Sequence, residues 1–236
     1  MTDLIGKVAI VTGGRRGIGL AIVQAFRKAG ARVFAVGKSL DDGATDYLRC
    51  DLLNREARRD LVRRVVDKAG RVDILVNNAG DLVFNPAWRY PLNDWDAQIE
   101  LLLTAPFDLC QQAAQVMIEQ HAGKIINIAS ITAFQGARNC VAYVAAKHGL
   151  IGLARALAVE WSTHNIQVNA IAPGYIDTDM LAHLTADAEH SAAMLGRIPA
   201  GRYGTGEDVA GAALYLAGAD YVTGDCVMVD GGWRVR

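Results

Sequence analysis

Tyr143 and Lys147 lie four residues apart in a stretch with helical periodicity, so we expect both side chains on one face of a helix. Tyrosine has a pKa of about 10, too high for a general base at neutral pH. A nearby ammonium group favours the phenolate, so we expect Lys147 to lower the pKa of Tyr143 and let the phenol exchange a proton with an alcohol or ketone. Ser130 precedes this pair, and its hydroxyl can hydrogen-bond the reacting oxygen. These three residues are the candidate catalytic groups.

A glycine-rich segment, TGGRRGIG at residues 12–19, follows an apolar run and opens a helical stretch. Glycines allow the backbone to approach a pyrophosphate closely, and the first turn of a helix supplies free N–H groups and the positive end of the helix dipole. A tight turn without a ligand is the alternative, but the strand before the segment and the helix after it favour a dinucleotide site. The cofactor contacts expected here are Gly13, Arg16, Gly17, Ile18 and Gly19.

Short apolar runs alternate with amphipathic stretches of helical length along the whole chain. The apolar runs are Lys7–Thr12, Arg32–Val36, Tyr47–Cys50, Asp73–Asn77, Lys124–Ala129, Gln167–Ala172 and Cys226–Val229. The helical stretches are Gly17–Ala29, Arg55–Ala69, Trp95–Gln120, Val141–Trp161 and Glu207–Ala217. Continuous apolar runs are typical of parallel strands covered on both faces, and the alternation indicates right-handed crossovers. The sequence therefore predicts an α/β fold, a single Rossmann-type doubly wound parallel sheet of about seven strands with helices on both faces.

No linker, internal repeat or low-complexity tract divides the sequence, so residues 1–236 are predicted to form a single dinucleotide-binding and catalytic domain. Residues 175–204 lack a regular pattern, and we expect this segment to form a lid over the substrate. Pro106 lies inside the helical stretch Trp95–Gln120 and is expected to kink it, because proline lacks the N–H that the preceding turn needs.

The composition excludes several classes of protein. The chain has 236 residues, a net charge of −1 and 52% hydrophobic residues, so it is neither disordered nor rich in the positive charge that nucleic-acid binding requires. No apolar run approaches the ~20 residues of a membrane span, and the N-terminus lacks the basic region of a signal peptide. The four cysteines form no CxxC pair and the five histidines have no metal-binding spacing, which predicts a cytoplasmic protein with reduced thiols and no metal.

Several motifs, in order along the chain, resemble those of the short-chain dehydrogenase/reductase family. They are Gly13-x-x-x-Gly17-x-Gly19, Asn77-Asn78-Ala79-Gly80, and Ser130 followed by Tyr143-x-x-x-Lys147. The resemblance implies an NAD(P)-dependent oxidoreductase that interconverts a secondary alcohol and a ketone. It implies further cofactor contacts from Asp51, Asn78, Ala79, Gly80, Tyr143, Lys147, Pro173, Gly174 and Thr178. Family members pair through the two long helices, which implies a homotetramer.

One position departs from the family's pattern. The segment Asp94–Leu103 resembles the stretch in which an asparagine holds a water that links the active-site lysine to solvent, and that asparagine falls at Leu102. A leucine side chain has no hydrogen-bonding atom. We therefore expect the water relay at this position to be lost, while the three candidate catalytic groups remain.

The substrate class is indicated by a closer resemblance within the family. The segments Gly123–Gln135, His164–Tyr175, Arg197–Gly204 and Asp230–Trp233 resemble those of bacterial sugar-acid dehydrogenases, which implies a substrate such as 2-deoxy-D-gluconate. A carboxylate favours an arginine at the pocket, and the candidates are Arg138, Arg197 and Arg202. The alternatives are a reductase of another carbonyl, such as a 3-oxoacyl thioester, and a nucleotide-binding protein with low turnover.

The choice between NAD and NADP depends on the end of the second predicted strand. An acidic residue there binds the adenosine ribose of NAD and repels the 2′-phosphate of NADP, but this chain has Gly37 followed by Lys38. Arg16 and Lys38 are suited to bind that phosphate. Asp41 and Asp42 lie close by in the sequence, and sugar-acid dehydrogenases of this kind are typically NAD enzymes. The balance favours NADP.

Overall fold

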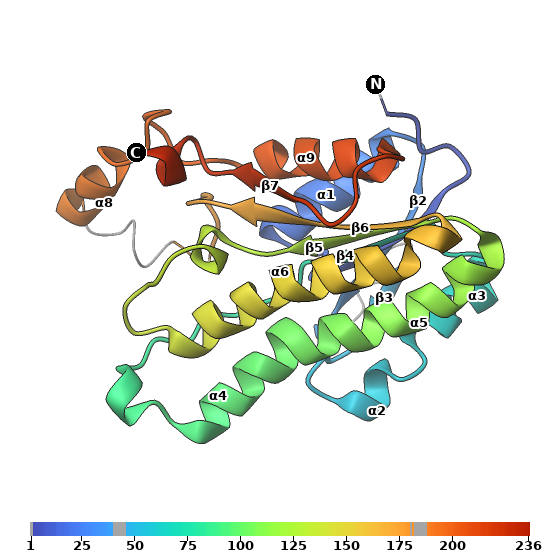
Figure 1. The fold of residues 1–236 in the computed structure, drawn as a ribbon, viewed down its shortest axis with the longest axis horizontal. Coiled ribbons are helices and arrows are strands. Elements are labelled where there is room, and N and C mark those ends of the chain that lie inside the picture. The colour runs from blue at the N-terminus through green and yellow to red at the C-terminus, as the bar shows by residue number, and fades with distance from the viewer. Residues whose placement is uncertain (1, 40–45, 180, 182–187) are drawn as a thin grey trace.

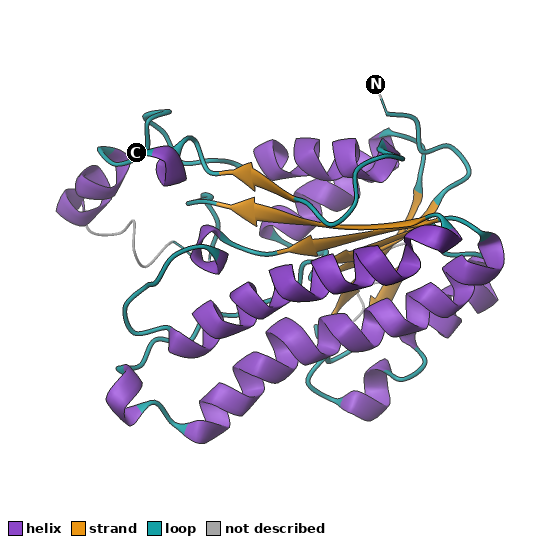
Figure 2. Ribbon diagram, viewed as in Figure 1, coloured by secondary structure: helices purple, strands orange, loops and turns teal. Residues whose placement is uncertain are grey.

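The computed structural model describes residues 2–39, 46–179, 181 and 188–236 and has one parallel sheet between two layers of helices (Figure 1, Figure 2). The strands are β1 (Val8–Thr12), β2 (Arg32–Gly37), β3 (Tyr47–Arg49), β4 (Ile74–Asn77), β5 (Gly123–Ile128), β6 (Ile166–Pro173) and β7 (Cys226–Val229). Their order is β3-β2-β1-β4-β5-β6-β7, and every neighbouring pair is parallel. The seven-stranded, doubly wound sheet predicted from the sequence is confirmed.

The helices cover both faces of the sheet, which explains why β1, β4 and β6 are buried along their whole length. On one face lie α1 (Gly17–Lys28) and α9 (Gly206–Gly218); on the other lie α3 (Leu61–Ala69), α5 (Ala105–Gln120) and α6 (Val141–Trp161) (Figure 1). The other elements are α2 (Arg55–Arg58), α4 (Leu92–Ile99), α8 (Ala188–Leu195), the π turn η2 (Glu100–Thr104) and the 3-10 turns η1 (Ala87–Arg89), η3 (Ile131–Ala133), η4 (Ser162–His164) and η5 (Trp233–Val235). None of the helices in the described ranges has the length and apolar character to cross a bilayer.

The stretch predicted as one helix over Arg55–Ala69 forms two helices, α2 and α3. Asn54 caps the first, with its side chain accepting a hydrogen bond from Ala57 N at 3.1 Å, and Asp60 precedes the second. Asn and Asp favour helix starts because their side chains can replace the missing backbone acceptors. Asp60 makes no such hydrogen bond, so only the start of α2 is explained by a side-chain cap. Arg58, just before the break, is turned into the interior.

The long helical stretch is also divided, one turn before the position expected. α4 continues through the π turn Glu100–Thr104 into α5, and Pro106 lies in the first turn of α5. Proline has no N–H, and its ring occupies the space of the carbonyl four residues earlier. The wider π turn accommodates the ring, so the irregularity falls just before Pro106.

The segment predicted as a lid, residues 175–204, is closed at its base. Ile176 and Gly204 form a bridge, with hydrogen bonds from Asp177 N to Gly204 O at 2.8 Å and from Gly204 N to Tyr175 O at 2.9 Å. α8 lies in the chain between the two bridge residues, Ile176 and Gly204. Residues 180 and 182–187 lie outside the described part of the chain, and closure over a substrate stays a prediction.

Candidate active site

The candidate site lies at the carboxyl ends of the strands, where the sheet order reverses between β1 and β4. β1 leads into a helix on one face of the sheet, whereas β4 and β5 lead into helices on the other. Such a switch point leaves a crevice outside the strand ends, and ligands of open α/β sheets bind there. The segments after β1, β4 and β5 carry most of the residues singled out from the sequence.

The segment after β4 closes against the glycine-rich loop. Thr12 Oγ1 accepts hydrogen bonds from Asn78 N at 2.9 Å and Ala79 N at 3.0 Å, and Asn78 Nδ2 donates to Thr12 O at 2.9 Å. Gly13 has a φ of +65°, and a Cβ on it would lie 2.9 Å from Asn78 Nδ2. A side chain at Gly19 would overlap the Gly13 carbonyl. The glycine-rich loop after β1 (residues 12–19) and the segment after β4 (residues 78–80) therefore form one narrow cradle for the predicted cofactor. This cradle requires glycine at positions 13 and 19.

The first turn of α1 has backbone N–H groups that the helix itself does not use. Arg16, the N-cap residue, makes no side-chain hydrogen bond to the helix, and no acidic residue lies in the first turn. Gly17 and Ile18 begin the helix, so their N–H groups have no partner within it. N–H groups in this arrangement bind phosphate. The cradle and the helix start together fit the pyrophosphate of a dinucleotide.

Ser130, Tyr143 and Lys147 come from two elements that meet at the end of β5. Ser130 caps the short η3 turn, with its Oγ accepting a hydrogen bond from Thr132 N at 3.2 Å. Tyr143 and Lys147 are one turn apart on α6, and Lys147 Nζ lies 5.5 Å from the centre of the Tyr143 ring. Lys147 Nζ also donates to the carbonyl of Ile128, the last residue of β5, at 2.7 Å. The fold thus brings the three candidate catalytic groups together.

Burial dominates the ionisation of the Tyr143–Lys147 pair. Burial raises the pKa of Tyr143 to about 12, although a hydrogen bond with Ser130 acts in the opposite direction. Burial also lowers the pKa of Lys147 to about 8. For the protein chain alone, burial of the phenol outweighs the hydrogen bond with Ser130, so the pKa of Tyr143 is raised where the sequence predicts that it is lowered. Tyr143 keeps its proton at neutral pH.

Leu102, the residue at which the resemblance predicts the family's asparagine, is buried. Its Cδ2 would lie 3.2 Å from a Cβ on Gly80, so it packs against the segment after β4. One turn earlier, the Gln98 side chain is also buried, and its Oε1 has no hydrogen-bond partner among the described residues. Gln98 was not predicted as a site residue, although an amide four residues before Leu102 on a buried helix face was a visible signal. A buried amide oxygen of this kind needs a water or a ligand as its partner.

Among the predicted residues at the end of β6 and after it, Thr178 lies close to the glycine-rich loop. Pro173 ends β6, and Gly174 follows it with its N–H bonded to the carbonyl of Val229 at 2.9 Å. Thr178 lies against the start of α1, since its Cγ2 would be 3.3 Å from a Cβ on Gly17. These residues are therefore placed where a ligand of the cradle would extend toward β6.

The adenosine end of the predicted site lies at β2 and β3. Lys38 follows β2, and Asp51 follows β3. The guanidinium carbon of Arg15 lies 4.7 Å from the centre of the Tyr47 ring, which brings a second basic residue of the glycine loop toward β3. Arg15 was not among the predicted contacts. The acidic pair Asp41–Asp42 lies outside the described residues.

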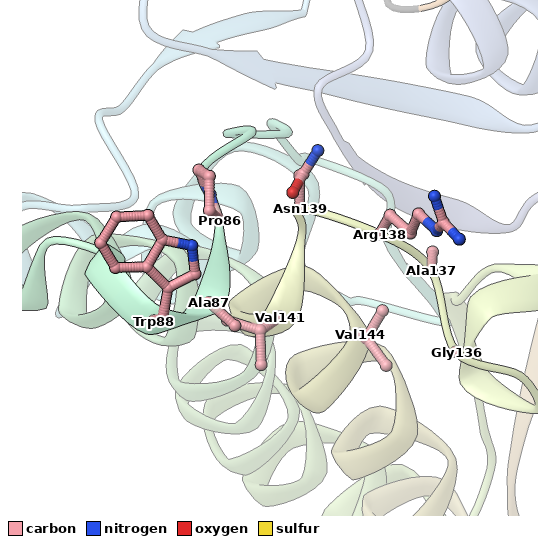
Figure 3. Close-up of a pocket in the computed structure, with 9 residues that line it drawn as sticks. All are labelled: Pro86, Ala87, Trp88, Gly136, Ala137, Arg138, Asn139, Val141 and Val144. Carbon is pink, nitrogen blue, oxygen red and sulfur yellow. The ribbon is translucent and has the colours of Figure 1, made fainter.

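Two cavities lie beside the elements that carry the candidate catalytic groups. The larger, of about 400 Å³, lies between η1 and the start of α6, with Trp88 and Arg138 toward opposite ends (Figure 3). The smaller, of about 340 Å³, is lined in part by Tyr175, Ile198 and the turn 230–232.

A glycine cradle at the switch point of a parallel sheet, beside a Ser–Tyr–Lys group, defines the class of dinucleotide-dependent oxidoreductases. The model of the family described as enoyl-(acyl carrier protein) reductase matches residues 13–234. The chain belongs to the short-chain dehydrogenase/reductase family of NAD(P)-dependent oxidoreductases, which confirms the resemblance found in its motifs.

Relatives with different names match the chain over nearly its full length. The 2-dehydro-3-deoxy-D-gluconate 5-dehydrogenase of Pseudoalteromonas atlantica is 40% identical over 249 residues, covering 99% of this chain and 98% of that protein. The 3-oxoacyl-[acyl-carrier-protein] reductase FabG of Chlamydia pneumoniae is 41% identical over 243 residues, covering 97% of each. The crystal structure of a gluconate 5-dehydrogenase from Burkholderia cenocepacia, in complex with NADP and tartrate, has a TM-score of 0.95 and 32% identity, covering 100% of this chain and 98% of that one.

Proposed function

We propose that the protein interconverts a secondary alcohol and a ketone on a sugar acid, with Ser130, Tyr143 and Lys147 as its catalytic groups. The observation that carries the proposal is the buried Lys147 ammonium, which is fixed by the last carbonyl of β5 and lies beside the Tyr143 ring. Two of the relatives above bear the names of sugar-acid dehydrogenases, which supports this class of substrate.

In the direction of ketone reduction, the Tyr143 hydroxyl is the proton donor. With a pKa of about 12 in the free protein, it is protonated at neutral pH and can donate to the carbonyl oxygen. The Ser130 hydroxyl donates a second hydrogen bond to the same oxygen and stabilises the negative charge that develops there. In alcohol oxidation the roles reverse, and Tyr143 accepts the proton.

The cradle supplies the binding groups for NAD(P). When bound, the cofactor supplies or accepts the hydride, and its oxidised form carries a positive charge that favours the Tyr143 phenolate. Lys147 has two N–H donors left after its bond to Ile128 O, and these are suited to the ribose hydroxyls. The other proposed contacts are Gly13, Arg16, Gly17, Ile18, Gly19, Lys38, Asp51, Asn78, Ala79, Gly80, Tyr143, Pro173, Gly174 and Thr178.

Leu102 changes how protons reach this site. Its side chain offers no hydrogen bond to a water, so a relay between Lys147 and solvent through this position does not operate. Proton exchange must then use the substrate's own hydroxyl groups or water held by other polar atoms.

A cofactor-reduction and cofactor-oxidation assay across three substrate classes tests the proposal. The classes are sugar acids, simple secondary alcohols with their ketones, and 3-oxoacyl thioesters. We expect the highest kcat/KM with a sugar acid. A higher value with a 3-oxoacyl thioester would replace the proposal by the activity for which the Chlamydia relative is named. Cofactor binding without turnover in any class would indicate a nucleotide-binding protein.

We propose that NADP is preferred over NAD. The Arg16 side chain is 79% exposed beside the cradle, and its described ion pair with Asp179 is long, at 3.8 Å between exposed groups. Such a pair is weak, so Arg16 can turn to a 2′-phosphate, with Lys38 nearby after β2. We expect kcat/KM to be higher with NADP, and Arg16→Ala to lower it for NADP by about tenfold while leaving NAD unchanged. A preference of the unmodified protein for NAD above tenfold would contradict this assignment.

We propose that the protein assembles as a homotetramer through its outer helices. Phe107 on α5 and Val141 and Val159 on α6 expose apolar side chains, and α4 packs beside α6 in the same layer. Association would remove this apolar surface from water. We expect sedimentation velocity at micromolar concentration to give a species of four times the 25.3 kDa chain mass. A monomer under those conditions would rule out the tetramer.

A further inference from the structure

The three arginines considered for a substrate carboxylate have different surroundings, and Arg202 is already paired. Its Nη1 and Nη2 bind the two carboxylate oxygens of Asp208 at 2.7 and 3.0 Å. Asp208 also forms the capping box with Thr205 at the start of α9. The hydrogen bond from Arg202 is the main reason that the pKa of Asp208 is held at about 2, so the pair is ionised at neutral pH. A substrate at Arg202 would have to break this bidentate pair.

Arg138 lines the cavity of Figure 3, which faces a different side of α6 from the candidate catalytic groups. Val141 and Val144 are the α6 residues of that cavity. Successive residues of an α-helix are rotated by about 100° around its axis. The mean direction of the Val141 and Val144 side chains therefore differs from that of Tyr143 and Lys147 by roughly 110°. A ligand in that cavity would therefore contact a different face of α6 from the one that carries Tyr143 and Lys147.

Arg197 is held on an aromatic surface and has no ion-pair partner among the residues that the structure describes. Its guanidinium carbon lies 4.2 Å from the centre of the Trp233 ring. Trp233 is buried and contacts Tyr175 edge to face, with ring centres 4.7 Å apart. Stacking on an aromatic face orients a guanidinium without using its N–H donors. The donors of Arg197 thus remain available for an anion.

The aromatic support of Arg197 is continuous with the loop that carries Ser130. Trp233 packs in one apolar cluster with Ile198, the neighbour of Arg197, and with Ile131, the residue after Ser130. The 340 Å³ cavity adjoins this cluster through Ile198; its lining includes the paired Arg202 and Asp208 and does not include Arg197. An anion bound at Arg197 would therefore lie on the side of the site where Ser130 begins η3.

Electrostatic effects link the same residues to Tyr143. Burial raises the pKa of Tyr175, while Arg197 acts to lower it and Cys140 to raise it. Cys140 acts in the same direction on the pKa of Tyr143. Arg197 and Cys140 therefore both lie near enough to Tyr175 to affect its pKa. Cys140 also lies near enough to Tyr143 to affect the pKa of Tyr143.

We propose that Arg197, stacked on Trp233, binds the carboxylate of the sugar acid while the reacting oxygen lies at Ser130 and Tyr143. The planar guanidinium can give two parallel hydrogen bonds to a carboxylate, which fixes both charge and orientation. Arg197 is a specificity-determining residue and takes no part in proton or hydride transfer. This inference rests on the proposed sugar-acid activity.

The test compares D-gluconate with D-gluconamide, which has nearly the same shape and no charge, in the full-length protein at saturating cofactor. The variants are Arg197→Gln, Arg197→Lys and the control Arg138→Gln. We expect Arg197→Gln to lower kcat/KM for gluconate by about 10- to 100-fold, mainly through KM, and to leave gluconamide unchanged. Arg197→Lys should recover part of the loss, because it restores the charge without the stacked, forked geometry. Arg138→Gln should leave the ratio between the two substrates unaltered.

Two results would overturn the role of Arg197. One is an unchanged ratio of gluconate to gluconamide in Arg197→Gln; the other is an equal loss with both substrates, which would show a structural role. Thermal midpoints and cofactor affinities of the variants identify a folding defect, and in that case Arg197→Lys gives the decisive ratio. If the unmodified protein acts on 3-oxoacyl thioesters and on neither gluconate derivative, the proposed function itself is wrong, which is a separate result.

Discussion

Replacing Tyr143 by phenylalanine should lower turnover by at least ~100-fold, the scale on which a positioned acid or base contributes. The substitution removes one hydroxyl and keeps the ring that faces Lys147 Nζ. That hydroxyl is the proposed proton donor, and burial keeps it protonated with a pKa of about 12. Lys147 retains its hydrogen bond to Ile128 O, so the proposed cofactor contacts other than the Tyr143 hydroxyl are kept and cofactor binding should persist.

Steady-state kcat with a sugar acid and a fluorescence titration with the cofactor measure the two parts of this prediction. Tyr215→Phe is the matched control, because Tyr215 lies on α9 and is 54% exposed, away from the candidate site. We expect the control to keep wild-type turnover. If Tyr143→Phe also keeps it, Tyr143 is not the proton donor. If its cofactor affinity falls along with turnover, the substitution has disturbed the cradle.

The cradle and the Tyr143–Lys147 pair could be predicted from the sequence because their geometry is local. Two residues four apart on a helix share a face whatever the rest of the chain does. Likewise, glycines between a strand and a helix fix a close backbone approach within a few residues, as the positive φ of Gly13 shows. The parallel order of the strands then brings the segments after β1, β4 and β5 to one edge.

The direction of the Tyr143 pKa could not be predicted in the same way. It depends on how completely α6, η3 and the end of β5 remove the phenol and the ammonium from water, which is a property of the packed fold. Spacing in the sequence indicates that Lys147 is near, but not that both groups are buried. Spacing alone therefore cannot give the direction in which the pKa of Tyr143 moves.

The burial of Arg58 could not be predicted from the sequence either, because it too depends on the packed fold. It lies in a run of exposed charges, yet its own side chain is fully buried. Its Nε binds Asp108 Oδ2 at 2.6 Å, its Nη2 binds Glu100 Oε1 at 2.5 Å, and its Nη1 binds Leu52 O at 2.5 Å. Two of these partners are 50 and 42 residues away in sequence, so no local pattern indicates them.

This buried cluster holds the π turn in place. Glu100 begins η2 and Asp108 lies in the first turn of α5, so Arg58 joins the two sides of the turn that carries Leu102. Burial alone would lower the pKa of Arg58, but its hydrogen bonds to the carboxylates of Asp108 and Glu100 raise that pKa, so the guanidinium stays charged. A buried charge satisfied by two carboxylates and a carbonyl is stabilising only while every partner is present.

Arg58→Ala should therefore destabilise the protein by about 3 kcal/mol, the lower end for breaking a buried pair, because Glu100 and Asp108 are partly exposed and regain water. For a chain of this length the melting temperature should fall by about 6–12 °C at fixed protein concentration. Arg59→Ala is the matched control: Arg59 is the next residue, 67% exposed, and pairs with an exposed Glu56. An exposed pair contributes at most about 1 kcal/mol, so the control should shift the melting temperature far less. Equal shifts for the two variants would mean that the Arg58 cluster contributes no more to stability than an exposed ion pair, and that the π turn is held by the packing of α4 and α6 instead.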